Sequence, residues 1–229
     1  MGFKISIALI ILAAFNLHSV EETAAEPCTK KILVVGCGRS GTTYITRFFQ
    51  LSGLDVIHER STGSDGCASW FALGGIYFPP EPILESTQFE HVFHQVRHPL
   101  HVITSWMINV SNLKSWEWVF IRLHVPEISR RDSLLVQCAK YWYYWNLKAE
   151  KVAEWRYRIE DLPFVLSEFE LRLKIPFDSA VFDMLPCNIN TWAPTSNKIT
   201  WAKLQKALPK ALFKRLRGMA YRYGYSIVD

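Results

Sequence analysis

The chain has 229 residues, of which 49% are hydrophobic and 21% charged, and its formal net charge is +5. These values are typical of one globular domain with its own core, and they exclude a disordered or collagen-like chain. The positive charge suits an anionic ligand, but no block of like charges is long enough to predict nucleic acid binding.

The N-terminus has the pattern of a targeting segment. Lys4 precedes residues 5–15, all but one of which are apolar. This run is shorter than the roughly 20 residues of a membrane span, and it predicts a signal peptide or short signal anchor over residues 1–25. A terminal segment packed on the domain is the alternative. We therefore expect a protein of the secretory pathway, in the Golgi lumen if eukaryotic, with membrane attachment through residues 5–20 as an option and a cytoplasmic location as the alternative.

Strand and helix patterns alternate along the rest of the chain. Four apolar residues, Ile32 to Val35, predict a buried strand, and a helix is expected from Thr42 to Gln50 after a glycine-rich turn. The later patterns predict strands over 54–57, 90–96 and 155–159, a helical turn over 68–73, and helices over 99–110, 114–124, 134–153 and 203–223. This alternation predicts an α/β fold with a mostly parallel sheet, in one domain over residues 26–229, with its ligand at the C-terminal ends of the strands.

The glycine-rich turn between the first strand and helix, Gly36-Cys-Gly-Arg-Ser-Gly-Thr-Thr43, has the composition of an anion-binding loop. Glycines allow backbone N–H groups to approach a phosphate, and the N-terminus of the helix that follows favours negative charge. Arg39 adds a positive charge, and Ser40, Thr42 and Thr43 add hydroxyl groups. The sequence therefore predicts a phosphate-bearing ligand.

Two common phosphate-binding loops match this turn in part. A nucleotide triphosphatase loop has the same length, but Thr42 stands where its lysine should be. A dinucleotide fingerprint matches at Gly36, Gly38 and Gly41, and Glu59 lies at about the right distance to bind a ribose hydroxyl. An NAD(P)-dependent oxidoreductase, a nucleotide kinase and a non-catalytic nucleotide-binding P-loop protein therefore stay open as alternatives.

Further motifs favour a third family. The loop over residues 36–43 resembles the 5′-phosphosulfate loop of sulfotransferases that use 3′-phosphoadenosine 5′-phosphosulfate (PAPS). Arg97, at the end of a predicted strand, and Ser105, on the next helix, resemble the 3′-phosphate segment of that family. Residues 157–162 and 224–225 resemble a later strand end and the usual family ending. The resemblance is nearer the Golgi, tyrosylprotein-like and bacterial-like branches than the cytosolic branch, whose C-terminal Arg-Lys-Gly segment is not recognisable here.

The resemblance implies a P-loop-type three-layer sandwich that moves a sulfuryl group from PAPS to a hydroxyl or amine without a metal ion. The acceptor would be a glycan, a protein tyrosine or a small alcohol. The residues implied to bind PAPS are Gly38, Arg39, Ser40, Gly41, Thr42 and Thr43 at the 5′-phosphosulfate, and Arg97 and Ser105 at the 3′-phosphate. Arg39 would also stabilise charge on the leaving phosphate, and Glu59 is the candidate general base, with His58 next.

Overall fold

The computed structural model describes residues 28–59, 61–74, 87–109, 115–186 and 198–228. The predicted signal segment over 1–25 and the membrane attachment through 5–20 lie outside this part of the chain. Within it, no helix combines the length and the apolar character that crossing a membrane requires. The described elements, in chain order, are β1 (Cys28–Gly36), α1 (Thr42–Leu51), β2 (Val56–His58), β3 (Gly66–Ala68), η1 (Phe71–Gly74), β4 (Thr87–Val96), α2 (Pro99–Asn109), α3 (Trp116–His124), α4 (Leu134–Val152), β5 (Trp155–Arg158), η2 (Ile159–Phe164), α5 (Leu166–Leu173), α6 (Val181–Met184), α7 (Trp201–Ala207) and α8 (Lys210–Arg222).

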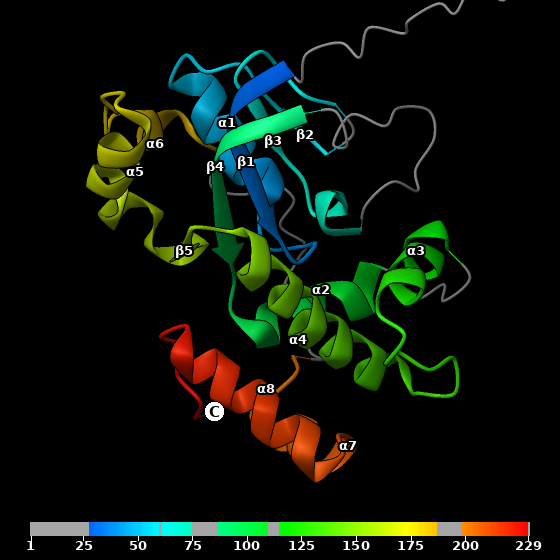
Figure 1. Cartoon of the computed structure of the whole chain (residues 1–229). Coiled ribbons are helices and arrows are strands. Elements are labelled where there is room, and N and C mark those ends of the chain that lie inside the picture. The colour runs from blue at the N-terminus through cyan, green and yellow to red at the C-terminus, as the bar shows by residue number, and fades with distance from the viewer. Residues whose placement is uncertain (1–27, 60, 75–86, 110–114, 187–197, 229) are drawn as a thin grey trace, which may run out of the picture.

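The five strands form one parallel sheet in the order β2-β3-β1-β4-β5, with helices on both faces (Figure 1). The predicted α/β fold with a parallel central sheet is thereby confirmed. Along β1, successive side chains point to opposite faces. Ile32 and Val34 pack in the core of α1, α5 and α6, whereas Leu33 and Val35 pack on the other face, where Ala149 of α4 lies. Both faces of β1 are therefore buried, which explains its unbroken apolar run.

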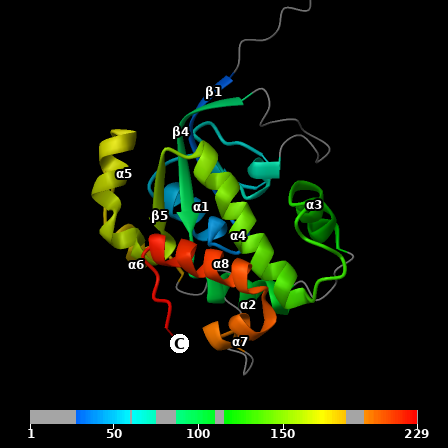
Figure 2. The same ribbon diagram turned by 60° about the horizontal axis from the view of Figure 1, so that its bottom comes forward.

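The largest core lies between α4 and the helices around it. Its buried side chains come from α2, α3, α4, α7 and α8, and they include Trp118, Trp142 and Trp145. Helix α8 crosses α4 on the side away from the sheet (Figure 2). The buried aromatic side chains of α4 are thus part of the core.

Two local predictions were wrong. The helical turn predicted from residue 68 begins later, because Gly66–Ala68 forms β3 and inserts between β1 and β2. Gly66 has φ of 141°, and a Cβ there would lie 1.8 Å from the carbonyl oxygen of Ile32, so only glycine fits this close pairing. A three-residue strand has no periodicity to detect.

The single helix predicted over 203–223 is two helices, α7 and α8. Pro209 separates them because it lacks a backbone N–H and disfavours helical geometry in the preceding residue. Leu208 is accordingly extended, with φ of −93° and ψ of 146°.

Candidate functional site

The glycine-rich loop joins β1 to α1 at the C-terminal edge of the sheet, as predicted. Gly41 occupies the N-cap of α1 with φ of 92°, a conformation that glycine adopts without strain. Ser40 is fully buried, and its Oγ has no hydrogen-bond partner among the described residues. A buried hydroxyl without a partner is costly in a folded protein, so a ligand that reaches Ser40 would recover a hydrogen bond.

Side chains from two other elements hold the loop carbonyls. Trp106 Nε1 donates to the Gly38 carbonyl at 2.9 Å, and Gln95 Nε2 donates to the Ser40 carbonyl at 2.7 Å. Because the C=O and N–H of a trans peptide point in opposite directions, the N–H groups of Arg39 and Gly41 point away from these side chains. Neither N–H finds an acceptor in the described part of the chain. The loop therefore presents two oriented backbone donors, as an anion site requires.

Gln95 connects the loop to the sheet. It lies in β4 with Gly36 of β1 opposite on one side and Tyr157 of β5 opposite on the other. Tyr157 donates its hydroxyl to Gln95 Oε1 at 2.6 Å, which fixes the amide so that its nitrogen faces Ser40. A Cβ at Gly36 would lie 2.3 Å from the Gln95 carbonyl oxygen, so the two strands approach closely here. We did not predict Gln95 from the sequence. The strand β4 carries several other polar residues, among them His91 and His94, and no sequence pattern distinguishes Gln95 from them.

The predicted anion-binding residues Arg39, Arg97 and Ser105 come together. Arg39 Nε donates to Ser105 Oγ at 3.0 Å, and Arg97 Nη1 donates to the Arg39 carbonyl at 3.2 Å. Neither arginine forms an ion pair with a carboxylate of the described residues. Burial lowers the pKa of Arg39, as does the charge of Arg97, while Glu59 opposes this shift. Two guanidinium groups thus share a partly dry region, which favours an anion between or beside them.

One of the predicted base candidates, His58, faces the hydroxyl groups of the loop, and the other, Glu59, lies beside it. His58 Nε2 lies 2.9 Å from Thr42 Oγ1, 3.2 Å from Thr43 Oγ1 and 3.3 Å from Glu59 Oε1. Burial lowers the pKa of His58 to about 4, so the imidazole is neutral at pH 7. A neutral ring offers one donor and one acceptor nitrogen, so His58 orients the threonine hydroxyls rather than adding positive charge.

The backbone is strained at two residues of the candidate site. Arg39 has φ of 70° and Glu59 has φ of 66°. Among the described non-glycine residues, Lys174 alone shares this left-handed conformation, and it caps the C-terminus of α5. Such residues cost on the order of 1–3 kcal/mol and cluster at functional sites. The strain therefore marks two of the three catalytic candidates that the sequence pattern selected, and not His58.

Comparisons with models of protein families, with curated proteins and with solved structures found no match to this chain. The described residues contain no group of three or more His, Cys, Asp or Glu side chains placed to hold one metal ion.

Proposed function

We propose that this protein is a PAPS-dependent sulfotransferase. The loop from Gly38 to Thr43 binds the 5′-phosphosulfate, and Arg97 and Ser105 bind the 3′-phosphate. The observation that carries the proposal is the contact of Arg39 with Ser105 and Arg97 across more than fifty residues of chain. This contact joins the two motifs of the resemblance in one site.

The proposed reaction is an in-line displacement at sulfur. Glu59 accepts the proton of the acceptor hydroxyl, the acceptor oxygen bonds to sulfur, and the bond from sulfur to the 5′-phosphate oxygen breaks. Adenosine 3′,5′-bisphosphate leaves with the bonding electron pair. Arg39 and the oriented N–H groups of the loop stabilise the charge that develops on the sulfuryl and leaving oxygens. Glu59 follows β2 directly, and its carboxylate lies 3.3 Å from His58 Nε2, the atom that contacts the threonine hydroxyls.

The strand order supports this proposal over a dinucleotide-dependent oxidoreductase. In the two common doubly wound sheets that bind dinucleotides or flavins, β2 pairs with β1. Here β3 pairs with β1, and β2 lies one strand farther out. Thr42, in place of the triphosphatase lysine, is buried with its hydroxyl at His58, which argues against a nucleotide kinase.

Thermal unfolding with nucleotides tests the proposal. A ligand present at 100 times its Kd stabilises the folded state by about 2.7 kcal/mol, or roughly 5 °C or more in melting temperature for a chain of this size. We expect such a shift with adenosine 3′,5′-bisphosphate and a much smaller one with NADPH or Mg-ATP. Stabilisation by NADPH alone, or an equal response to adenosine 5′-phosphate and the bisphosphate, would overturn the proposal.

A further inference from the structure

The positive charge of this protein is concentrated at its C-terminus. Residues 198–229 contain eight of the 26 Lys and Arg residues and one, Asp229, of the 21 Asp and Glu residues. This segment alone therefore carries more positive charge than the whole chain, whose net charge is +5, and the remainder is net negative. Charge separated in this way produces a local positive potential that attracts anions.

Helix α8 presents much of this charge on one side. Leu212, Leu216 and Met219 are buried against the rest of the core. Lys210, Lys214, Arg217 and Tyr221 recur at spacings of four, three and four residues, which places them on one helix face. Over three helical turns, α8 therefore offers three cations in a row, followed by an aromatic ring.

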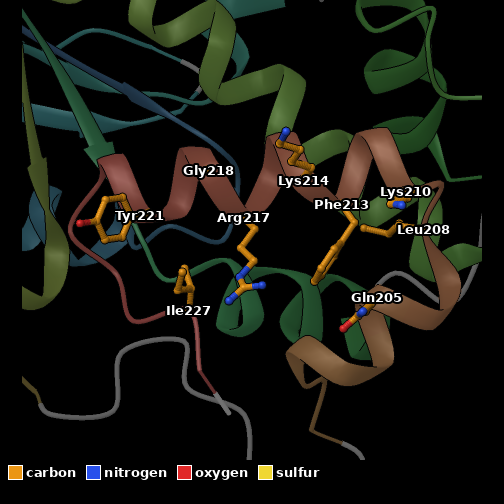
Figure 3. A pocket seen from close by; sticks show the side chains of 9 residues that line it. All are labelled: Gln205, Leu208, Lys210, Phe213, Lys214, Arg217, Gly218, Tyr221 and Ile227. Carbon is orange, nitrogen blue, oxygen red and sulfur yellow. The ribbon is translucent and has the colours of Figure 1, made fainter.

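These residues line a groove rather than a flat surface. The groove has a volume of about 650 Å³ and lies along α8, with α7 and the C-terminal segment as its borders (Figure 3). Apolar atoms form most of its wall, among them those of Phe213 and Ile227, and Gln205 of α7 adds an amide. The volume is within the range that binds an organic ligand, and the lining combines apolar surface with a few polar groups.

No carboxylate of the described residues balances the charge of the groove cations. Lys210, Lys214 and Arg217 form no ion pair with any carboxylate of the described residues. By contrast Arg222, one turn beyond, pairs with Glu150 at 3.5 Å. The three groove cations are therefore available to an external anion.

The C-terminal segment links this groove to the nucleotide site. Ile227 lines the groove, and two residues earlier the ring of Tyr225 lies 5.0 Å from the ring of His98, the neighbour of Arg97. Glu160 strengthens this junction, because it accepts from the His98 N–H at 3.0 Å and from the Tyr225 hydroxyl at 3.1 Å. A ligand in the groove would thus lie on the side of the molecule that carries the 3′-phosphate segment.

The lining distinguishes between classes of polyanion. Helix α8 buries its apolar side, so it lacks the exposed apolar face with which an amphipathic helix enters a membrane. Helices α7 and α8 and the C-terminal segment line the groove, so its described lining offers no strand edge to an extended peptide. Single-stranded nucleic acids stack on successive aromatic rings, whereas Phe213 packs on Trp201 and leaves Tyr221 as the exposed ring of the lining. One exposed ring, one amide and a row of cations suit a sugar chain that carries acidic groups.

We propose that the groove binds an acidic glycan, a sugar chain bearing carboxylate or sulfate groups, and that this glycan is the acceptor for the sulfuryl group. The identification as acceptor rests on the proposed function, whereas the binding site does not. Lys210, Lys214 and Arg217 bind the acidic groups, and Tyr221 contacts the face of a sugar ring. The groove positions the chain, and the transfer takes place at the loop.

Calorimetric titration with a chondroitin sulfate hexasaccharide tests the binding site. The charge reversals Lys210→Glu, Lys214→Glu and Arg217→Glu, made together, should weaken binding by about tenfold or more, since each removes an attraction and adds a repulsion. The matched control reverses the exposed Arg130, Arg131 and Lys151, which changes the net charge equally on other surfaces. It should retain most of the affinity. The three glutamine substitutions at the groove serve as a milder variant if the glutamates impair folding.

Competing ligands and kinetics complete the test. An uncharged chitin hexasaccharide should bind far more weakly. The glycan assignment would be overturned if the control variant lost as much affinity as the groove variant, or if both groove variants kept the wild-type affinity. Tighter binding of oligo-dT, polyglutamate or phosphatidylserine vesicles than of the glycan would also overturn it. With PAPS as donor, the groove variant should raise KM for the glycan and leave kcat unchanged. If the glycan binds but the bisphosphate does not stabilise the protein, the proposed function and the acceptor assignment are both refuted. If the bisphosphate binds but the glycan does not, only the proposal that the groove binds a glycan is refuted.

Discussion

Arg39 and Ser105, separated by 66 residues, are joined by a hydrogen bond of 3.0 Å from the arginine Nε to the serine Oγ. This bond uses one of the five guanidinium N–H groups and fixes the plane of the others. Within the described part of the chain, the Nη atoms of Arg39 have no hydrogen-bond acceptor. Helix α2 therefore orients the loop arginine and leaves its planar fork available for oxygens of a phosphate or sulfuryl group.

Arg39→Lys should show whether the site needs only the positive charge of residue 39 or also the planar donor arrangement of its guanidinium group. Lysine keeps the positive charge but loses the fork and the bond to Ser105. We expect sulfuryl transfer to fall by about 100-fold, as when a transition-state donor is lost, with a smaller effect on bisphosphate affinity. Steady-state kinetics with PAPS measure the change, and Arg47→Lys on the exposed side of α1 is the control. Full activity of the Arg39 variant would remove this residue from the mechanism.

Arg97→Ala should abolish the preference for a 3′-phosphate. The guanidinium is held by its own bond to the Arg39 carbonyl, and it forms no ion pair with the described carboxylates. Thermal shifts with adenosine 5′-phosphate and adenosine 3′,5′-bisphosphate should differ in the wild type and become similar in the variant. Arg131→Ala, on an exposed loop, should retain the difference. If the Arg97 variant keeps the wild-type preference, the 3′-phosphate binds elsewhere.

Glu59→Gln should lower turnover and leave nucleotide binding intact. The amide matches the carboxylate in size but cannot accept the proton of the acceptor hydroxyl, a contribution of about 100-fold to 10,000-fold in rate. Thermal shift with the bisphosphate serves as the binding control, because Glu59 is not assigned to the phosphates. Unchanged turnover would exclude Glu59 as the base and direct attention to His58.

Gln95 and Tyr157 should together hold the loop in place through one hydrogen bond, from Gln95 to the Ser40 carbonyl. Tyr157→Phe removes the hydroxyl that orients the Gln95 amide, and Gln95→Met removes the donor to the Ser40 carbonyl. Both variants should bind the bisphosphate more weakly, with a stability cost of about 1–3 kcal/mol for the buried group left unpaired. If the pair acts in series, the double variant should lose little more affinity than Gln95→Met. Additive losses would show that the two side chains act independently.

Acid should destabilise the protein through a buried histidine. Burial lowers the pKa of His94 to about 4, against an opposing hydrogen bond with Asn146 at 2.9 Å. His94 binds a proton near pH 6.5 in the unfolded chain and only near pH 4 in the folded protein. Its contribution to the unfolding free energy is therefore fully present above pH 6.5 and is lost as the pH falls from 6.5 to 4. From pH 7 to pH 4.5, His94 should remove about 2 kcal/mol of unfolding free energy.

Urea unfolding at the two pH values measures this effect. His94→Gln removes the titrating group, so its loss of stability between pH 7 and pH 4.5 should be smaller than that of the wild type by about the same amount. His58, whose pKa burial also lowers to about 4, contributes a loss of the same sign in both proteins. An equal loss in wild type and variant would show that His94 is not responsible.

The sequence by itself determined the local chemistry of this protein. The apolar run from Ile32 to Val35, the three glycines of the loop and the helix after it are encoded by neighbouring residues. Periodicity and turn composition report such local structure, and they were sufficient for the α/β fold with a parallel sheet. The pattern also selected Arg39 and Glu59, the two non-glycine residues of the site that the structure holds at positive φ.

The tertiary structure decided which distant groups meet. Pairing of β4 with β1 and β5 sets Gln95 between the loop and Tyr157, and packing of α2 and α4 brings Trp106 and Tyr141 to Gly38. The strand order also depends on β3, which is too short to carry a pattern. Contacts of this kind follow from sheet order and helix packing across more than fifty residues of chain. A one-dimensional pattern does not encode them, because periodicity reports which face of an element is buried and not which partner buries it.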